Sequence, residues 1–334
     1  MQPTGRRGRH PPLGPGAPSA LWSVRLCAGG LGGPQLMRRS VRRHQHRMSS
    51  TELLDLERRV RETPGAWSVT VDRRIDTDSS VLLFGQRHHQ HVVLKVVRRP
   101  GDEWVSGAVV SAFGGRGVVR ALEHVDGAVL LEQLMPGNSL ADLPRRGDDD
   151  QATAILADVI GRMSPDSAPR NTPTVEAWGL GFRRYVETRD RQIPSALLEA
   201  AGGVYERLCA TQSSRHLLHG DLHHYNVLFD ADRGWLAIDP KGVVGELEYE
   251  VGAALRNPYG QPTLFTAPDI IRRRAERFAA ALSMDVPRLL GWAFAQAVLA
   301  AVWLVEDGVT IGRDNAWLAL ASQLRPMLNG TVDA

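Results

Sequence analysis

Apolar and polar positions alternate along the first part of this chain in the way that β-strands require. After a helical pattern at 51–62, with Thr51 as the expected N-cap, runs rich in β-branched residues are separated by polar turns. The pattern predicts strands and one main helix in the order 67–73, 81–85, 91–97, helix 102–113, 118–123 and 128–133. An antiparallel sheet with one main helix is therefore expected up to residue 134.

From residue 135 the apolar positions recur every three to four residues, which is typical of amphipathic helices. Helices are predicted at 150–163, 194–212, 270–282, 286–305 and 315–328, with short strands and turns at 217–238. The stretch 291–305 is almost wholly apolar, but it is too short to cross a bilayer and predicts a buried core helix. The fold class is α+β, with an N-terminal lobe at 48–134 and a larger, mostly helical lobe at 135–330.

Charge divides the chain unevenly. Residues 1–47 hold nine arginines and no Asp or Glu, so removing them from a formal net charge of +3 leaves the rest six charges negative. The segment shows no hydrophobic period and is predicted to be a disordered basic extension, with Met48 as an alternative start; a transit peptide or a nucleic-acid-binding arm stays open. An acidic body favours a cationic small-molecule partner over nucleic acid.

Two cysteines in the whole chain, Cys27 and Cys209, are too few for a disulfide framework and fit the reducing cytoplasm. No membrane span and no obligate protein partner is predicted. Lysine usage is more informative, because the 40 basic residues include only Lys95 and Lys241. A compact ammonium differs from the planar guanidinium of arginine, and a phosphate site is one reason to keep it.

The run from His219 to Asn226 and the apolar strand ending at Asp239 carry the clearest chemistry. A phosphotransferase needs one carboxylate to orient an attacking hydroxyl, here Asp221, and oxygen ligands for Mg²⁺ on the ATP phosphates. A hairpin of residues 226–239 would bring Asn226 and Asp239 together as those ligands. A zinc site of His219, Asp221 and the two following histidines is the alternative, although no histidine occurs after residue 224.

Lys95 interrupts an apolar strand and needs an acidic partner, for which Glu103 at the start of the predicted helix is the candidate. The hydroxyls of Ser79 and Ser80, in the turn after the first strand, are candidate caps for phosphates. At the end of the last strand of this lobe, Glu132 and Leu134 lie where backbone groups and apolar side chains can hold an adenine.

These residues resemble the aminoglycoside and hydroxyurea resistance kinases, a group that includes the streptomycin 6-phosphotransferases. The resemblance is carried by His219-Gly220-Asp221-Leu222-His223-His224 with Asn226 and by Ile238-Asp239-Pro240, and it spans roughly residues 65 to 325. It implies a protein-kinase-like bilobal fold and ATP-dependent phosphorylation of a small-molecule hydroxyl, such as the 6-hydroxyl of streptomycin. By match, it implies Asp221 as the catalytic carboxylate, Asn226 and Asp239 as Mg²⁺ ligands, and Lys95 with Glu103 at the phosphates.

Lys241, two residues after the metal-ligand candidate, is expected to neutralise the transferring phosphate. The acceptor is expected to meet the end of the motif and carboxylates of the C-terminal lobe: His224, Tyr225, Glu246, Glu248, Glu250 and Asp307, with Glu306 and Asp314 as further acidic candidates. Tyr225 is the residue that differs from the polar or acidic one expected in close streptomycin kinases. A kinase for hydroxyurea or another small metabolite, and a non-catalytic binding protein of kinase fold, remain the alternatives.

Overall fold

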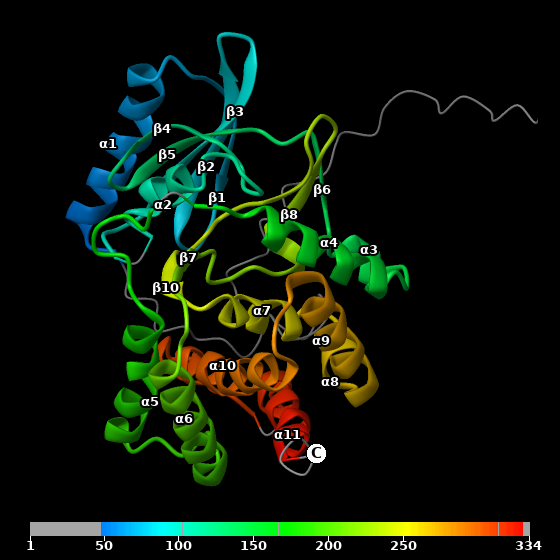
Figure 1. Ribbon diagram of the computed structural model, residues 1–334. Helices are drawn as coiled ribbons and strands as arrows, with labels where there is room; N and C mark the ends of the chain where they lie inside the picture. The colour runs from blue at the N-terminus through cyan, green and yellow to red at the C-terminus, as the bar shows by residue number, and fades with distance from the viewer. Residues whose placement is uncertain (1–47, 102, 166, 313, 330–334) are drawn as a thin grey trace, which may run out of the picture.

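The computed structural model describes residues 48–329 except 102, 166 and 313. The basic extension predicted for 1–47 lies outside the described residues. Two lobes follow one another along the chain, a sheet with two helices above and a helical body below (Figure 1). This is the α+β architecture that the hydrophobic pattern predicts.

The N-terminal lobe is built on one antiparallel sheet of order β1-β2-β3-β5-β4. Its strands and helices are α1 (Ser50–Ala66), β1 (Thr70–Asp76), β2 (Ser80–Arg87), β3 (Gln90–Val97), α2 (Ser106–Ala112), β4 (Ala121–Val125) and β5 (Ala128–Glu132). The predicted order is correct. The prediction of Thr51 as the N-cap of α1 is wrong. Ser49 caps the helix: its hydroxyl accepts from the Glu52 N–H, and the Glu52 carboxylate accepts from the Ser49 N–H.

The two faces of this sheet are buried by different partners. On one face, Leu56 and Val60 of α1 pack against a small core that includes Leu94. On the other face, Phe84 and Val93 join the large core that continues through the C-terminal lobe. Because that core is shared, apolar packing as well as the connecting chain fixes the sheet over the lower lobe.

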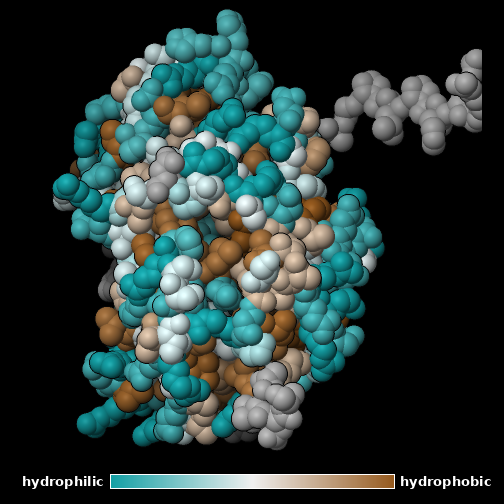
Figure 2. Space-filling model, viewed as in Figure 1, coloured by the Kyte–Doolittle hydropathy of each residue, from teal (hydrophilic) through white to brown (hydrophobic). Residues whose placement is uncertain are grey.

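The C-terminal lobe contains short strands and many helices. They are β6 (Pro136–Ser139), α3 (Asp142–Arg145), α4 (Asp149–Arg162), α5 (Val175–Thr188), α6 (Ser195–Ala210), β7 (His216–Leu218), β8 (Val227–Asp230), β9 (Gly234–Ala237), β10 (Val243–Gly245), α7 (Leu247–Leu255), α8 (Pro262–Thr266), α9 (Pro268–Leu282), α10 (Val286–Glu306) and α11 (Ala316–Asn329). Strands β6-β8-β9 form one sheet and β10-β7 another. On the face shown in Figure 2, hydrophilic residues dominate the upper lobe and hydrophobic residues gather toward the middle.

Helix α5, which contains Gly179 and Gly181, was not predicted. Two glycines within a single helix weaken its intrinsic propensity. In the folded chain they allow close packing instead: a Cβ at Gly179 would come within 2.5 Å of the Tyr205 ring, and one at Gly181 within 2.9 Å of Leu299. The close contacts of α5 with Tyr205 and Leu299 thus stabilise this helix.

Helix α10 (Val286–Glu306) is the apolar helix expected in the core, and it matches the predicted range 286–305 to within one residue. Its 21 residues are long and apolar enough to cross a membrane, but 78% of its most hydropathic window is buried in the structure. It runs across the lower lobe among α5, α6, α7 and α11 (Figure 1). Its fully buried Trp292 contacts Tyr205 and Tyr249 edge to face, at centroid distances of 5.1 and 5.0 Å.

Candidate active site

A loop between β7 and β8 carries Asp221, and a buried carboxylate holds the backbone of that loop. The two oxygens of Glu250, on α7, accept hydrogen bonds from the backbone N–H groups of His219 (2.6 Å) and Gly220 (3.0 Å). Burial raises the pKa of Glu250 to about 7. Glu250 therefore lies beneath the loop and is 1% exposed. The prediction that it contacts the acceptor at the surface is wrong.

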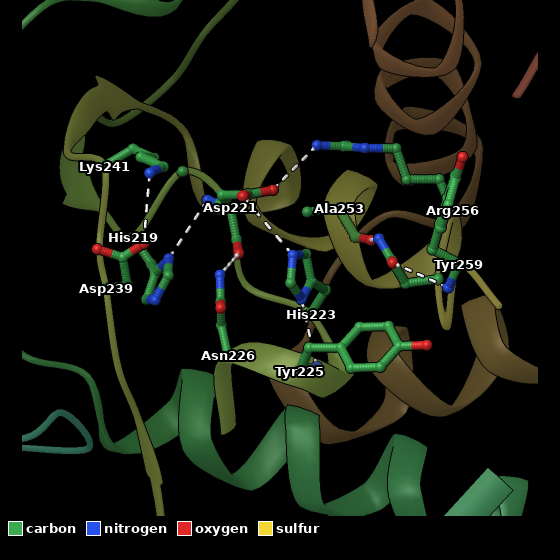
Figure 3. Close-up of polar contacts among 12 residues, drawn as sticks. His219, Asp221, His223, Tyr225, Asn226, Asp239, Lys241, Ala253, Arg256 and Tyr259 are labelled. Carbon is green, nitrogen blue, oxygen red and sulfur yellow. Dashed lines mark hydrogen bonds and ion pairs between the residues drawn. The ribbon is translucent and has the colours of Figure 1, made fainter. Parts of the chain in front are cut away.

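Gly220 is required at its position in this loop. Its φ of +81° is a left-handed conformation, and a Cβ there would lie 2.8 Å from the Trp178 ring. The backbone can therefore pack closely on α5 while the next residue, Asp221, points toward Arg256 (Figure 3).

The histidines of the motif support the loop from within. His219 donates from Nε2 to the Ile238 carbonyl (2.9 Å), while its Nδ1 accepts from the Asp221 N–H (3.3 Å). His223 accepts at Nδ1 from the Tyr225 N–H and places Nε2 3.6 Å from Asp221. Since these ring nitrogens are engaged, and no group of three or more His, Cys, Asp or Glu in the described residues is placed to hold a metal ion, the geometry does not favour the zinc alternative.

His224 occupies a different environment from the one expected. It is fully buried near Arg274, and burial lowers its pKa well below the usual value. Neither ring nitrogen has a hydrogen-bond partner among the described residues. Its side chain is enclosed within the fold and does not line an acceptor cleft.

The hairpin β8–β9 brings the two expected metal ligands to one end. Val227 pairs with Ala237, and the Ile238 N–H donates to the Asn226 carbonyl at 2.8 Å, which places Asn226 beside Asp239. The Asn226 amide N–H donates to the Asp221 carbonyl (3.0 Å) and orients the side chain toward the loop (Figure 3). One amide and one carboxylate are a donor set that suits Mg²⁺.

Four charged side chains form a ring between the lobes, which we call the charge ring: Lys95, Glu103, Lys241 and Asp239. Lys95 Nζ lies 2.9 Å from Glu103 Oε2 and 2.6 Å from Asp239 Oδ1. Lys241 Nζ lies 2.6 Å from Glu103 Oε1 and 3.3 Å from Asp239 Oδ2. Both lysines of the chain therefore contact both carboxylates.

Burial alone would raise the pKa of the Asp239 carboxyl, but the Lys241 and Lys95 ammonium groups outweigh it and hold the pKa low. The predicted pair of Lys95 and Glu103 is present, although Glu103 does not lie at the start of a helix. It lies in a turn that precedes α2, which begins only at Ser106.

Arg256, at the end of α7, was not identified from the sequence. Its guanidinium lies 3.3 Å from Asp221 Oδ1, and its other arm donates to Gln296 of α10 at 3.0 Å. The arginine side chain is 7% exposed. A single basic residue at the end of the apolar run 251–255 is the signal that could have identified it.

Beside Asp221, aromatic side chains and a loop form the wall opposite the charge ring. Tyr225 is half-buried, its hydroxyl accepts from the Gly260 N–H (3.3 Å), and the Arg145 guanidinium lies 5.7 Å from the centre of its ring. Tyr259 contacts Trp317 at 5.6 Å between ring centres. Of the two acceptor candidates in the motif, Tyr225 is thus the half-buried one, and its ring packs edge to face on His223 (Figure 3).

The acidic acceptor candidates are dispersed. Glu246 is 1% exposed and pairs with Arg288 (2.6 Å) and with the indole of Trp292, which anchors α7 to α10. Glu248 is half-buried in the first turn of α7, and Asp307 is exposed at the end of α10. The structure does not gather these carboxylates around Asp221.

The remaining nucleotide-site candidates lie at opposite ends of the sheet, because Ser80 pairs with Val97 at the end of β3 and Glu132 pairs with Val92 near its start. Ser80 is buried, with its hydroxyl 3.1 Å from that of Thr77, so the turn between β1 and β2 uses it internally; Ser79 is half-buried in the same turn. Glu132 accepts from the Arg120 N–H (2.8 Å) and from Arg233, and Leu134 is 1% exposed. Their side chains support the connection between the lobes.

Comparison with known proteins adds an independent line of argument. Residues 66–308 match the model of the family described as aminoglycoside/hydroxyurea antibiotic resistance kinase. Streptomycin 3''-kinase of Klebsiella pneumoniae is 34% identical over 244 residues, which cover 70% of this chain and 87% of that protein. Streptomycin 6-kinase of Streptomyces griseus is 30% identical over 229 residues (64% and 71%), and hydroxyurea phosphotransferase of Kitasatospora aureofaciens is 31% identical over 235 residues (65% and 66%).

Solved structures share the fold at lower identity. Aminoglycoside phosphotransferase APH(4)-Ia, in a ternary complex with ADP and hygromycin B, superposes with a TM-score of 0.57 at 15% identity, covering 82% of this chain and 99% of that one. Choline kinase LicA from Streptococcus pneumoniae gives a TM-score of 0.55 at 15% identity, with coverage of 81% and 99%. The protein-kinase-like bilobal fold expected from the sequence is therefore confirmed.

Proposed function

Because this chain belongs to the aminoglycoside/hydroxyurea antibiotic resistance kinase family, we propose that it transfers the γ-phosphate of ATP to a hydroxyl of an aminoglycoside, streptomycin foremost. The chain is a phosphotransferase with an alcohol group as acceptor. The reaction belongs in the cytoplasm, where ATP is supplied. The hydroxyl is the 6-hydroxyl expected from the sequence or the 3''-hydroxyl after which the 34% identical relative is named.

The observation that carries this proposal is the convergence of Asp221, Asn226, Asp239 and Lys95 from separate elements. A carboxylate, an amide, a second carboxylate and an ammonium group meet at the cleft where β3 faces the β7–β8 loop. Phosphoryl transfer depends mostly on positioning and charge neutralisation, and these are the groups it uses. Their joint presence argues against the non-catalytic binding protein.

In the proposed mechanism, Asp221 accepts a hydrogen bond from the acceptor hydroxyl and takes its proton as the oxygen attacks the γ-phosphorus in line. Arg256 and the backbone held by Glu250 keep the Asp221 carboxylate oriented. Lys95 binds the phosphates that precede the transferred group, and Glu103 orients Lys95. The bond to the ADP leaving group breaks as the new O–P bond forms, and the proton stays on Asp221 until the product leaves.

Asn226 and Asp239 would hold Mg²⁺, which supplies charge neutralisation of the phosphates when bound. The fit rests on chemistry that the structure contains: a carboxylate whose pKa is held low and an amide oxygen at one end of a hairpin. The nucleotide would lie along the inner edge of β5, with Leu134 near the adenine.

For the acceptor, the structure supports an aromatic wall more than an acidic one. Tyr225 packs edge to face on His223, whose Nε2 lies 3.6 Å from Asp221, and the Tyr225 ring can pack on a sugar or a guanidinium-bearing ring. Glu248 is the remaining half-buried carboxylate of α7 that can still meet a cationic acceptor.

The test is transfer of radiolabelled γ-phosphate from ATP to streptomycin, hygromycin B and hydroxyurea in parallel, with product NMR to identify the hydroxyl. Asp221→Asn should abolish transfer, whereas Asp232→Asn, in the exposed turn between β8 and β9, should leave it unchanged. Transfer to hydroxyurea but not to aminoglycosides would favour the metabolite kinase. ATP binding without transfer to any acceptor, or full activity in Asp221→Asn, would contradict the proposal.

A further inference from the structure

The charge ring has no net charge, and it links the two lobes. Lys95 and Glu103 come from the upper lobe, and Asp239 and Lys241 from the lower one. Lys241 Nζ is 3.3 Å from the Asp239 carboxylate, so an ammonium group already lies against one of the proposed Mg²⁺ ligands. Two positive charges already balance the two negative ones.

Adding a divalent cation at Asp239 upsets this balance, because it would lie within a few ångströms of two ammonium groups. Coulomb repulsion at such distances is strong in a partly buried site. One ammonium group must therefore withdraw from Asp239 when the metal ion enters. Phosphate oxygens arriving with the metal ion provide the new partner for that group.

Lys241 is the lysine that can move. Lys95 lies on β3 between Leu94 and Val96, both fully buried, and its side chain is only 9% exposed. The Lys241 side chain is 24% exposed and extends from a loop. Its backbone stays fixed, because the His219 carbonyl accepts from the N–H groups of Lys241 (2.9 Å) and Gly242 (3.1 Å).

The loop is anchored on its other side as well. Gly242 has a φ of +77°, and a Cβ there would lie 2.8 Å from the side chain of Val109 in α2. The backbone of Lys241 is thus held between the β7–β8 loop and α2. Movement of the ammonium group needs only rotation about side-chain bonds.

We propose that Lys241 occupies the place of the metal ion while the site lacks nucleotide, and transfers to the phosphates when Mg²⁺-nucleotide binds. The inference rests on the proposed function, and it adds an exchange of one cation for another at Asp239. In the nucleotide-free enzyme Lys241 competes with Mg²⁺. In the loaded enzyme the same ammonium group neutralises the transferring phosphate. Lys241 therefore has opposite effects on metal affinity and on the rate of transfer.

The two-lysine composition makes a direct test possible. Uniform ¹⁵N-lysine labelling of the full chain gives two side-chain ammonium signals, which Lys241→Arg assigns. Addition of Mg²⁺ with ADP should shift the Lys241 signal strongly and the Lys95 signal less, and metal-free ADP should have a smaller effect on Lys241. An unchanged Lys241 signal at saturating Mg²⁺-ADP would overturn the exchange.

Calorimetry supplies the second measurement. Mg²⁺ alone should bind Lys241→Met about tenfold more tightly than wild type, within the usual range of coupling between two sites. Lys241→Arg keeps the charge and should stay near wild type. Arg61→Met removes an exposed charge from α1, whose side chain is 74% exposed, and serves as the matched control. Lys241→Met should also lower kcat.

Equal or weaker Mg²⁺ binding by a folded Lys241→Met would contradict the inference even if wild type proves to be an active kinase. Wild type that binds no Mg²⁺-ADP at all would overturn the proposed function, and the inference with it. If Lys241→Met fails to fold, the lysine signals of the wild-type protein still decide the matter.

Discussion

The guanidinium of Arg256, at the end of α7, lies 3.3 Å from the carboxylate of Asp221, which is 35 residues away along the chain in the β7–β8 loop. Its second arm is held by Gln296 of α10, whose amide N–H in turn donates to the Tyr249 carbonyl at 2.6 Å. The orientation of the proposed catalytic carboxylate is therefore tied to the central helix of the lower lobe.

Replacing Arg256 by Met should lower kcat by roughly 10²-fold, the size of effect that misplacement of a catalytic group produces, with little change in KM for ATP. The kcat of Arg256→Lys should lie between those of wild type and Arg256→Met. An ammonium group lacks the two separate N–H arms with which the guanidinium contacts both Asp221 and Gln296. Steady-state kinetics of both variants make the measurement, with a melting curve to confirm folding. Wild-type kcat in Arg256→Met would show that Asp221 is positioned without it.

The buried carboxylate of Glu250 should give the pH profile a limb near neutrality. Its pKa is raised to about 7, and only the ionised form accepts both loop N–H groups, so kcat should rise as pH increases through about 7. The free energy of unfolding should change with pH in the opposite direction to kcat. Because the pKa of Glu250 is higher in the folded protein, its contribution to stability is complete below its unfolded pKa near 4.5 and is lost as pH rises through about 7.

Glu250→Gln separates the two effects. The uncharged amide keeps one acceptor oxygen but turns its NH₂ group toward the other loop N–H, so kcat should fall, the limb near pH 7 should disappear, and the melting temperature should lose its pH dependence around neutrality. Glu276→Gln, at an exposed position of α9, is the matched control. Persistence of the limb in Glu250→Gln would assign it to another group.

Acid should destabilise the protein through the buried histidines. Burial lowers the pKa of His219 to about 4 and also lowers the pKa of His223 and His224. Because these histidines bind protons more readily in the unfolded chain than in the folded one, their contribution to the free energy of unfolding is complete above about pH 6.5 and is lost as pH falls toward 4. At about 1.4 kcal/mol per pKa unit, His219 alone accounts for roughly 3 kcal/mol. Urea unfolding across this range measures the slope.

His224→Met should reduce that acid sensitivity. The imidazole is fully buried with neither ring nitrogen paired among the described residues, and such groups cost about 1–3 kcal/mol. The variant should therefore be at least as stable as wild type at pH 7 and lose less stability at pH 5. His216→Met, at an exposed position, should change neither quantity. A variant less stable than wild type at both pH values would indicate a partner for the ring.

Substitution of Tyr225 should change KM for the acceptor and leave KM for ATP unchanged. Tyr225→Ala removes the ring beside Asp221 and should raise KM for the acceptor about tenfold, a value typical of one lost stacking contact. Tyr225→Phe keeps the ring, loses only the hydrogen bond from the Gly260 N–H, and should stay near wild type. An equal rise in KM for ATP would place Tyr225 outside the acceptor surface.

The parts of the site that could be predicted from the sequence are those set by short-range geometry. Asn226 and Asp239 belong to one hairpin, so strand register brings them together. Lys95 could be paired with Glu103 because an ammonium group inside an apolar strand needs a nearby acid. The boundary between lobes after residue 134, where the strand pattern gives way to the helical one, remains a proposal.

Other features depend on burial, which the sequence does not show. Glu246 and Glu250 look like surface acids but anchor α7 and the β7–β8 loop from within. Arg256 meets Asp221 only through the tertiary fold. Charge alone thus suggested an acidic acceptor cleft, whereas the structure uses those charges to hold the backbone.

The closed arrangement of Lys95, Glu103, Lys241 and Asp239 also bears on which anions the cleft admits. Inorganic phosphate or a nucleotide without its metal ion meets lysines that are already paired, and so gains little by displacing their carboxylates. A nucleotide that brings Mg²⁺ offers the carboxylates a new cation and the lysine a new anion in the same event. The charge ring would therefore make the site bind metal-loaded nucleotides in preference to other phosphates of the cell.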